Sequence, residues 1–156
     1  MDCISRYDSP LGRMLMTSDG EALTGLRFSD EAHVAAALSA DAVERDLPVF
    51  RETAAWLDRY FNGGRPDGLP RLRLIGTPFR LRVWQAVQKI PYGQTVSYAA
   101  LAKRLDASPR AVGNAAAHNP VLLIVPCHRV IGTDGRLTGY AGGLERKRKL
   151  IELEQK

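Results

Sequence analysis

Cysteine and histidine are scarce in this chain of 156 residues, which has two cysteines and three histidines. Cys3 and Cys127 lie too far apart for the closely spaced disulfide framework of a small secreted domain. Cys3 has no Cys or His neighbour at the spacing of a zinc site, so we predict no metal and no other cofactor. This cysteine usage is typical of a reduced setting, and we expect a cytoplasmic protein.

Long apolar runs are also missing. No uninterrupted apolar stretch approaches the roughly 18 residues that a membrane span needs. The acidic residues Asp2 and Asp8 flank Ile4 near the start, so a signal peptide is not expected. Apolar residues make up 45% and charged residues 25% of the chain, which is typical of globular proteins. The length of 156 residues is enough for one domain of ordinary size or for two small ones.

Lysine is missing from the first half, where arginine is the only basic residue besides histidine. Residues 1–75 contain 9 Lys+Arg and 12 Asp+Glu, a balance of −3, whereas residues 76–156 contain 13 and 5, a balance of +8; together they give the net +5. A basic half is expected where a protein binds phosphate groups. By itself, the excess is equally typical of a solvated basic surface.

The N-terminal half predicts strands followed by helices. Apolar runs at residues 5–7, 14–16 and 23–28 alternate with turn-forming clusters. An alanine-rich, acidic helix is predicted over 30–46, and a better helix over 47–61. The apolar face of the second helix comprises Phe50, Ala54, Leu57 and Phe61. Glycine and proline end this helix, and we place a domain boundary at residue 75.

The C-terminal half contains three helix-start signals, Thr77-Pro78, Ser97 and Ser108-Pro109. The second and third predicted helices are separated by a tight break, which is the form of a helix-turn-helix. Many helical proteins contain such a pair by chance. However, residues 110–117 are mostly Gly and Ala, which lets the backbone approach a narrow groove closely with little sequence preference.

Residues 121–125 form an apolar, strand-like run that leads through Pro126 to Cys127 and His128. A thiol attacks as thiolate, and a nearby imidazole is the usual base for it. The adjacency alone equally describes a buried cysteine and a structural histidine. A basic helix is predicted over 144–154, and Glu154 at its end could be an ordinary helix-end carboxylate.

Five motifs together decide between these interpretations. In order and spacing they resemble the O6-alkylguanine-DNA alkyltransferases: Gly76-Thr77-Pro78-Phe79, Arg110-Ala111-Val112-Gly113, Asn119-Pro120, Pro126-Cys127-His128-Arg129-Val130 and Gly139-Tyr140-Ala141-Gly142-Gly143-Leu144. The resemblance implies an α+β protein. A small ribonuclease-H-like β-sheet/helix domain (1–75) would precede a mostly helical domain with a helix-turn-helix (76–156).

The resemblance also implies a role for each matching residue. Cys127 would be the alkyl acceptor, with His128 acting on it through a water and Glu154 orienting the imidazole. Asn119 would link the recognition helix to the site, and Tyr98 would donate a proton toward N3 of the base. Arg110 would enter the duplex in place of the flipped nucleotide.

Two further sets follow from the same resemblance. The DNA-contacting set is Arg110, Ala111, Gly113, Ala116, Tyr98, Phe79, Arg80 and Thr133. The residues lining the base pocket are Pro120, Val130, Tyr140 and Ala141. Ala141 stands where some family members carry serine, so a side-chain hydrogen bond to O6 is not expected.

The implied reaction is transfer of the alkyl group from O6-alkylguanine, with O4-alkylthymine as a possible second substrate, to the cysteine. The S-alkyl product is a thioether without an electrophilic carbonyl, so each protein would act once. The expected partner is double-stranded DNA, bound through the minor groove by a monomer with little sequence specificity.

Two other functions remain open from the residues alone. A cysteine hydrolase or acyltransferase would turn over repeatedly and need an oxyanion hole. A helix-turn-helix regulator or an alkyltransferase-like lesion sensor would bind DNA without chemistry, although such sensors lack the acceptor cysteine that is present here.

We predict that Arg110→Ala slows repair of duplex DNA far more than reaction with free O6-benzylguanine. Only in the duplex does the flipped nucleotide leave a space that the arginine side chain would fill. Rates of alkyl transfer from the two substrates would be compared. Equal losses on both would reject the proposed role of Arg110.

Overall fold

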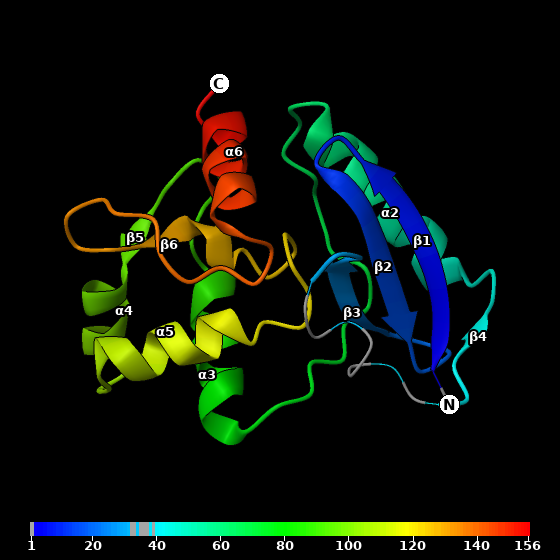
Figure 1. Ribbon diagram of the computed structural model, residues 1–156, viewed down its shortest axis with the longest axis horizontal. Coiled ribbons are helices and arrows are strands. Elements are labelled where there is room, and N and C mark those ends of the chain that lie inside the picture. The colour runs from blue at the N-terminus through cyan, green and yellow to red at the C-terminus, as the bar shows by residue number, and fades with distance from the viewer. Residues whose placement is uncertain (1, 32–33, 35–37, 39) are drawn as a thin grey trace. The chain divides into compact units, whose positions relative to one another are not determined.

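The computed structural model describes residues 2–31, 34, 38 and 40–156 (Figure 1). The chain divides into two compact units, Met1–Leu74 and Ile75–Lys156. Neither unit contains, among its described residues, a helix with the length and apolarity needed to cross a bilayer.

The first unit is built on a sheet of four strands in the order β3-β2-β1-β4. The three predicted strands are confirmed as β1 (Cys3–Ser9), β2 (Gly12–Ser18) and β3 (Leu23–Phe28), which pair antiparallel in sequence order. The short β4 (Val43–Glu44) runs parallel to β1.

The helix predicted over 30–46 is wrong at its C-terminal end, where β4 forms instead. Residues 32–33, 35–37 and 39 of that range lie outside the described residues. The backbone N–H of Val43 donates to the Asp2 carbonyl (2.9 Å), and that of Arg45 donates to the Ile4 carbonyl (3.2 Å). Pairing with the edge of β1 therefore overrides local helix propensity there.

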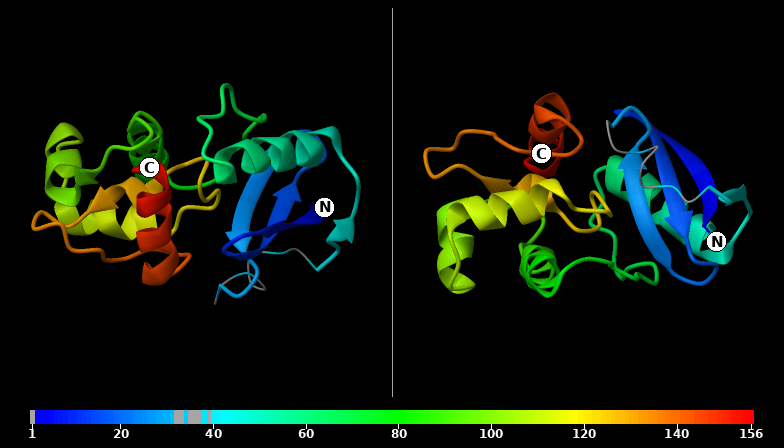
Figure 2. Two further views of the ribbon diagram at one scale, coloured as in Figure 1. Left: turned by 90° about the horizontal axis from the view of Figure 1, so that it is seen from above. Right: turned by 60° about the horizontal axis from the view of Figure 1, so that its bottom comes forward.

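Helix α2 (Pro48–Phe61) lies along one face of this sheet (Figure 2). Its buried face differs from the predicted one. Phe50 and Leu57 are buried as expected, but the rest of the face comprises Val49, Thr53, Trp56 and Tyr60. The rings of Trp56 and Tyr60 stack with centroids 5.5 Å apart. Burying two large rings removes more apolar area from water than burying Ala54 would.

The second unit contains α3 (Pro78–Gln88), α4 (Tyr98–Arg104), α5 (Pro109–Ala117) and α6 (Leu144–Glu154), with a parallel pair of short strands, β5 (Val96–Ser97) and β6 (Val130–Ile131). The three predicted helix starts are confirmed. The hydroxyls of Thr77, Ser97 and Ser108 each accept a backbone hydrogen bond from the third residue after them, at 3.0–3.2 Å. Each hydroxyl thereby satisfies one of the backbone donors left over at a helix start.

Helices α4 and α5 form the expected helix-turn-helix, and α3 holds α5 in place. The buried indole N–H of Trp84 on α3 donates to the carbonyl of Ala115 on α5 at 2.9 Å. On the inner side of α5, Val112 and Ala116 are also buried. Small side chains on α5 thus allow close packing against α3 while Arg110 remains exposed at the start of the helix.

The strand expected over 121–125 is not formed. All five residues are buried, but Leu123 has the left-handed φ of 70°, and the backbone N–H of Val125 turns back to the Val121 carbonyl at 3.0 Å. The Asn119 amide donates to the Val125 carbonyl (2.7 Å), and its oxygen accepts from the Val121 N–H (2.9 Å). One side chain thus satisfies backbone groups that would otherwise need a neighbouring strand.

We predict that Trp84→Phe lowers the free energy of unfolding by about 1 kcal/mol more than Trp56→Phe does, because only the first change removes a buried hydrogen bond. Trp56 is the matched control, since its buried indole nitrogen has no hydrogen-bond partner among the described residues. Urea unfolding followed by circular dichroism would measure both. Equal losses would contradict a stabilising role for the Trp84 bond.

Candidate active site

Cys127 begins the 3-10 turn η1 (Cys127–Arg129), immediately after the buried loop 119–126. Pro126 has ψ of 62°, and the backbone N–H of Cys127 donates to the Val125 carbonyl at 2.8 Å. Because the chain bends here, Cys127 and His128 do not alternate across a strand. The cysteine is only 2% exposed, so its thiol is covered by the surrounding residues.

The environment of Cys127 favours the neutral thiol. Burial raises the pKa of Cys127 to about 12, while a hydrogen bond with Asn119 and the charge of Lys147 act in the opposite direction. The thiolate is therefore almost absent at neutral pH in this closed arrangement. Nucleophilic attack needs a base that removes the proton during the reaction.

His128, the residue after Cys127, is the candidate for that base. It is fully buried, and its Nε2 lies 2.5 Å from Oε2 of Glu154 on α6. Burial lowers the pKa of His128, against the effect of the hydrogen bond to Glu154. A neutral imidazole that donates its Nε2–H to the carboxylate keeps Nδ1 as the basic nitrogen.

Glu154 accepts hydrogen bonds from more than the histidine. Arg129 donates through Nε to Oε1 (2.7 Å) and through Nη2 to Oε2 (3.2 Å), and the Gly93 N–H donates to Oε1 (3.2 Å). Arg129 also donates through Nη1 to the Ile90 carbonyl, just after α3, at 2.7 Å. The carboxylate thus joins η1, α6 and the segment after α3. Sequence reasoning did not select Arg129, although it directly follows the Cys-His pair.

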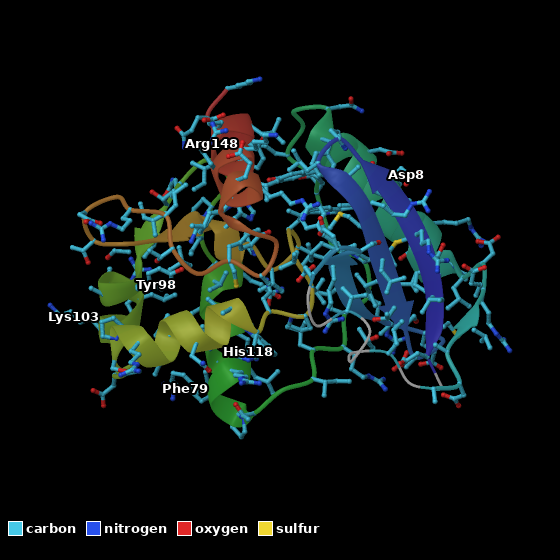
Figure 3. All side chains as sticks on the ribbon, in the orientation of Figure 1. Asp8, Phe79, Tyr98, Lys103, His118 and Arg148 are labelled. Atoms are coloured by element: carbon cyan, nitrogen blue, oxygen red, sulfur yellow. The ribbon has the colours of Figure 1, made fainter. Side chains whose placement is uncertain are left out.

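A second polar cluster surrounds Tyr98, at the N-terminus of α4 (Figure 3). Its hydroxyl donates to the Thr138 carbonyl (2.9 Å). The fully buried Lys147 of α6 donates to the same carbonyl (2.7 Å) and to the Tyr98 hydroxyl oxygen (3.2 Å). Burial raises the pKa of Tyr98, and it lowers the pKa of Lys147 to about 8, which the nearby Cys127 sulfur partly opposes.

Lys147 is a second residue that sequence reasoning missed, although the sequence carries a signal for it. It lies seven residues before Glu154 and three before the buried Leu150, so all three share one face of α6. A lysine and a glutamate on the buried stripe of a helix are unusual outside functional sites.

The residues expected to contact DNA divide into surface and interior positions. Arg110 is exposed on α5, with Ala111 and Gly113 partly exposed; a Cβ added at Gly113 would lie 3.9 Å from the Tyr98 ring. Ala116, however, is 1% exposed and packs inward, so the structure removes it from the expected contact surface.

The remaining expected DNA contacts lie on α3 and in a turn. Phe79 and Arg80 occupy the partly exposed first turn of α3, where Figure 3 labels Phe79, and Thr133 is exposed in the turn 132–135. The basic side chain of Lys103 extends outward from α4 in the same view.

Of the residues expected to line the base pocket, Val130 directly follows the turn η1 and Tyr140 contacts His128. Pro120 and Val130 are buried, Val130 pairs with Val96 between β6 and β5, and Ala141 is partly exposed. The Tyr140 ring meets the His128 ring edge-on at 6.4 Å.

No group of three or more His, Cys, Asp or Glu residues lies close enough to hold a metal ion within the described ranges.

Comparison with known proteins identifies the family. The model for the DNA-binding domain of 6-O-methylguanine DNA methyltransferase matches residues 78–156, and that for its ribonuclease-like domain matches residues 4–67. The chain belongs to this methyltransferase family.

Similar proteins of this family come from several organisms. The methylated-DNA–protein-cysteine methyltransferase of Mycobacterium leprae is 43% identical over 153 residues, which cover 95% of this chain and 89% of that protein. The structure of Mycobacterium tuberculosis O6-methylguanine methyltransferase has a TM-score of 0.89 at 41% identity, covering 99% of this chain and 93% of that one. A complex of the tuberculosis protein with DNA has a TM-score of 0.88 at 41% identity, covering 98% and 92%.

We predict a characteristic pH dependence of stability from Lys147. Its pKa of about 8 in the folded protein lies below the 10.5 of an ordinary lysine, so the unfolded chain binds more protons between these values. Raising the pH through this window therefore stabilises the folded state. Relative to Lys147→Met, the free energy of unfolding of the wild type should rise by roughly 2 kcal/mol between about pH 7 and about pH 10.

Urea unfolding at both pH values would measure this difference. The control is Lys149→Met, which removes a lysine on the exposed side of α6. Its stability profile should run parallel to that of the wild type. A parallel profile for Lys147→Met as well would show that Lys147 is not held in a shifted ionisation state.

Proposed function

We infer that this protein repairs DNA by transferring the alkyl group of O6-alkylguanine directly to Cys127. The observation that carries this function is the buried His128–Glu154 pair, 2.5 Å apart, directly after the buried Cys127 in the chain. The proposal for this chain also draws on its methyltransferase relatives and on the DNA complex of the tuberculosis protein.

The reaction begins with a proton transfer. As the alkylated base arrives, the Cys127 proton passes to Nδ1 of His128, through a water in our proposal. The sulfur then attacks the alkyl carbon, a C–S bond forms, and the bond from that carbon to O6 breaks. Glu154 stabilises the resulting imidazolium, as a carboxylate beside a histidine base does in other nucleophilic sites.

The leaving group is a guanine anion, which is a poor leaving group unless it is protonated. Tyr98 donates its phenolic proton toward N3 of the base in this mechanism. Lys147, whose Nζ lies 3.2 Å from the Tyr98 hydroxyl, is the cation that stabilises the phenolate left behind. With its pKa lowered to about 8, Lys147 is still mostly charged at neutral pH.

The reaction ends in a thioether, which water does not hydrolyse, so one protein removes one alkyl group. A hydrolase would instead need an acyl intermediate with an electrophilic carbonyl. The residues around Cys127 leave it 2% exposed, so the incoming base has to displace some of them. We propose that the loop before α6, which contains Tyr140 and Ala141, moves aside when the base enters.

DNA binding involves the second unit, where the basic residues gather. Helix α5 enters the minor groove with its small residues Ala111 and Gly113 toward the backbone, and Arg110 occupies the space of the flipped nucleotide. Phosphate contacts of this kind carry little sequence specificity and weaken as salt rises. We further propose that the protein acts as a monomer in the cytoplasm and that O4-alkylthymine is a second substrate.

The deciding experiment is the intact mass of the protein after incubation with excess duplex DNA containing O6-methylguanine, followed by peptide mapping. We expect one added methyl group, on Cys127, and repair that stops at one lesion per protein. Repeated turnover would overturn the proposal in favour of a hydrolase, and lesion binding without modification would indicate a sensor.

Cys127→Ala is the matched control. It should abolish the mass increase yet still bind the lesion duplex in a gel-shift assay, because the change leaves the proposed DNA-contacting residues intact. Methyl transfer by Cys127→Ala would show that Cys3 or another group is the acceptor.

A further inference from the structure

We propose that Arg129 is a positioning residue of the alkyl-transfer site, which fixes Glu154 so that the carboxylate holds the His128 base in its working orientation. The inference rests on the proposed function and assigns a role to a residue outside the acceptor, its base and the proton donor. It is carried by the hydrogen bonds of one guanidinium to two separate segments of the unit.

The guanidinium of Arg129 fits Glu154 as a fork. Its Nε and Nη2 donate to the two different carboxylate oxygens, at 2.7 and 3.2 Å, and this bidentate geometry fixes the plane of the carboxylate. His128 approaches Oε2, the oxygen that Nη2 also contacts. The direction of the histidine hydrogen bond therefore depends on the orientation that Arg129 imposes.

The third contact of Arg129 anchors the fork. Nη1 donates to the Ile90 carbonyl at 2.7 Å, and the guanidinium lies 5.6 Å from the centre of the Tyr92 ring. These partners belong to the segment that follows α3, whereas Glu154 ends α6. The carboxylate is thus held to the segment after α3 as well as at the C-terminal end of α6.

Stability alone does not account for this arrangement. A buried ion pair loses the hydration of both ions, and replacing such a pair by apolar groups of similar size is often neutral or stabilising. Arg129 and Glu154 are 9% and 4% exposed, so both are largely dehydrated. A buried pair that also orients a catalytic base is better explained by positioning.

Other charged and titratable groups near this site act in different directions. Lys147 from α6 and Arg129 itself lower the pKa of His128, whereas Glu154 raises it. Cys127 lies on η1 beside the histidine, and Tyr140 faces its ring. If Arg129 acted only through its charge, its removal would make His128 more basic and would increase the reaction rate. If Arg129 positions Glu154, its removal should decrease the reaction rate. The two explanations therefore predict opposite changes in rate.

The test compares Arg129→Met and Arg129→Lys with the wild type in two reactions of Cys127. The first is alkyl transfer from free O6-benzylguanine, and the second is alkylation by iodoacetamide, each measured across a range of pH. The iodoacetamide rate depends on access to the thiol and on removal of its proton, without guanine recognition or DNA. Cys127→Ser provides the background from Cys3. Arg148→Met is the matched control, since Arg148 pairs with Glu145 and Glu152 on the exposed side of α6 (Figure 3).

We expect Arg129→Met to slow both reactions at least tenfold near neutral pH and to move the acid limb of the iodoacetamide profile to lower pH, because His128 loses the positioned carboxylate that raises its pKa. Arg129→Lys, which keeps the charge but cannot form the planar fork, should also be slowed, and by less. Arg148→Met should match the wild type. Circular dichroism at the assay temperature would establish that each variant is folded.

Three outcomes would overturn the proposal. Faster reaction of Arg129→Met would assign Arg129 an electrostatic effect only, and unchanged pH profiles in folded variants would assign it a structural role. Wild-type rates in Arg129→Lys would show that the fork geometry is unnecessary. Failure of the wild type with O6-benzylguanine but normal reaction with iodoacetamide would instead reject the proposed function, while the iodoacetamide series still tests Arg129.

Discussion

The site depends on the hydrogen bonds that the buried carboxylate of Glu154 accepts. It accepts hydrogen bonds from His128, Arg129 and the Gly93 backbone, which come from different segments of the second unit. A buried carboxylate without such donors would be strongly destabilising. The same bonds that compensate its burial therefore also determine where the end of α6, the turn η1 and the imidazole lie relative to one another.

Burial controls reactivity as well as geometry. The thiol of Cys127 is neutral at rest because its pKa is raised to about 12, and the imidazole beside it is buried too. A preformed thiolate would react with any small electrophile and consume a protein that acts once. A covered, protonated thiol with an adjacent base reacts only when a substrate reaches it and the proton moves, which suits a reagent that is used a single time.

The loop 119–126 connects this chemistry to the helix-turn-helix. Asn119 directly follows α5, and its amide satisfies the backbone of Val121 and Val125 just before the cysteine. On the other side, Trp84 fixes α5 to α3 through the Ala115 carbonyl. Because α5 is bonded to α3 on one side and is followed directly by Asn119 on the other, the position of this helix is coupled to that of the Cys127 thiol within the unit.

The sequence by itself determined the features that depend on neighbouring residues. These are the helix starts at Thr77, Ser97 and Ser108, the three N-terminal strands, and the Cys127–His128 pair with its surrounding motifs. Only the tertiary structure decided which hydrogen-bond partners the irregular backbone segments and the buried charged groups find. The sequence of 121–125 predicts a strand, but hydrogen bonds from Asn119 hold this segment as a loop. The sequence of Val43–Glu44 predicts a helix, but this segment pairs with the edge of β1. In the sequence, Lys147 and Arg129 resemble other basic residues. Only the fold brings Lys147 to Tyr98 and Arg129 to Glu154. Apolar periodicity is local, whereas satisfying a buried charge or backbone group depends on segments that only folding brings together.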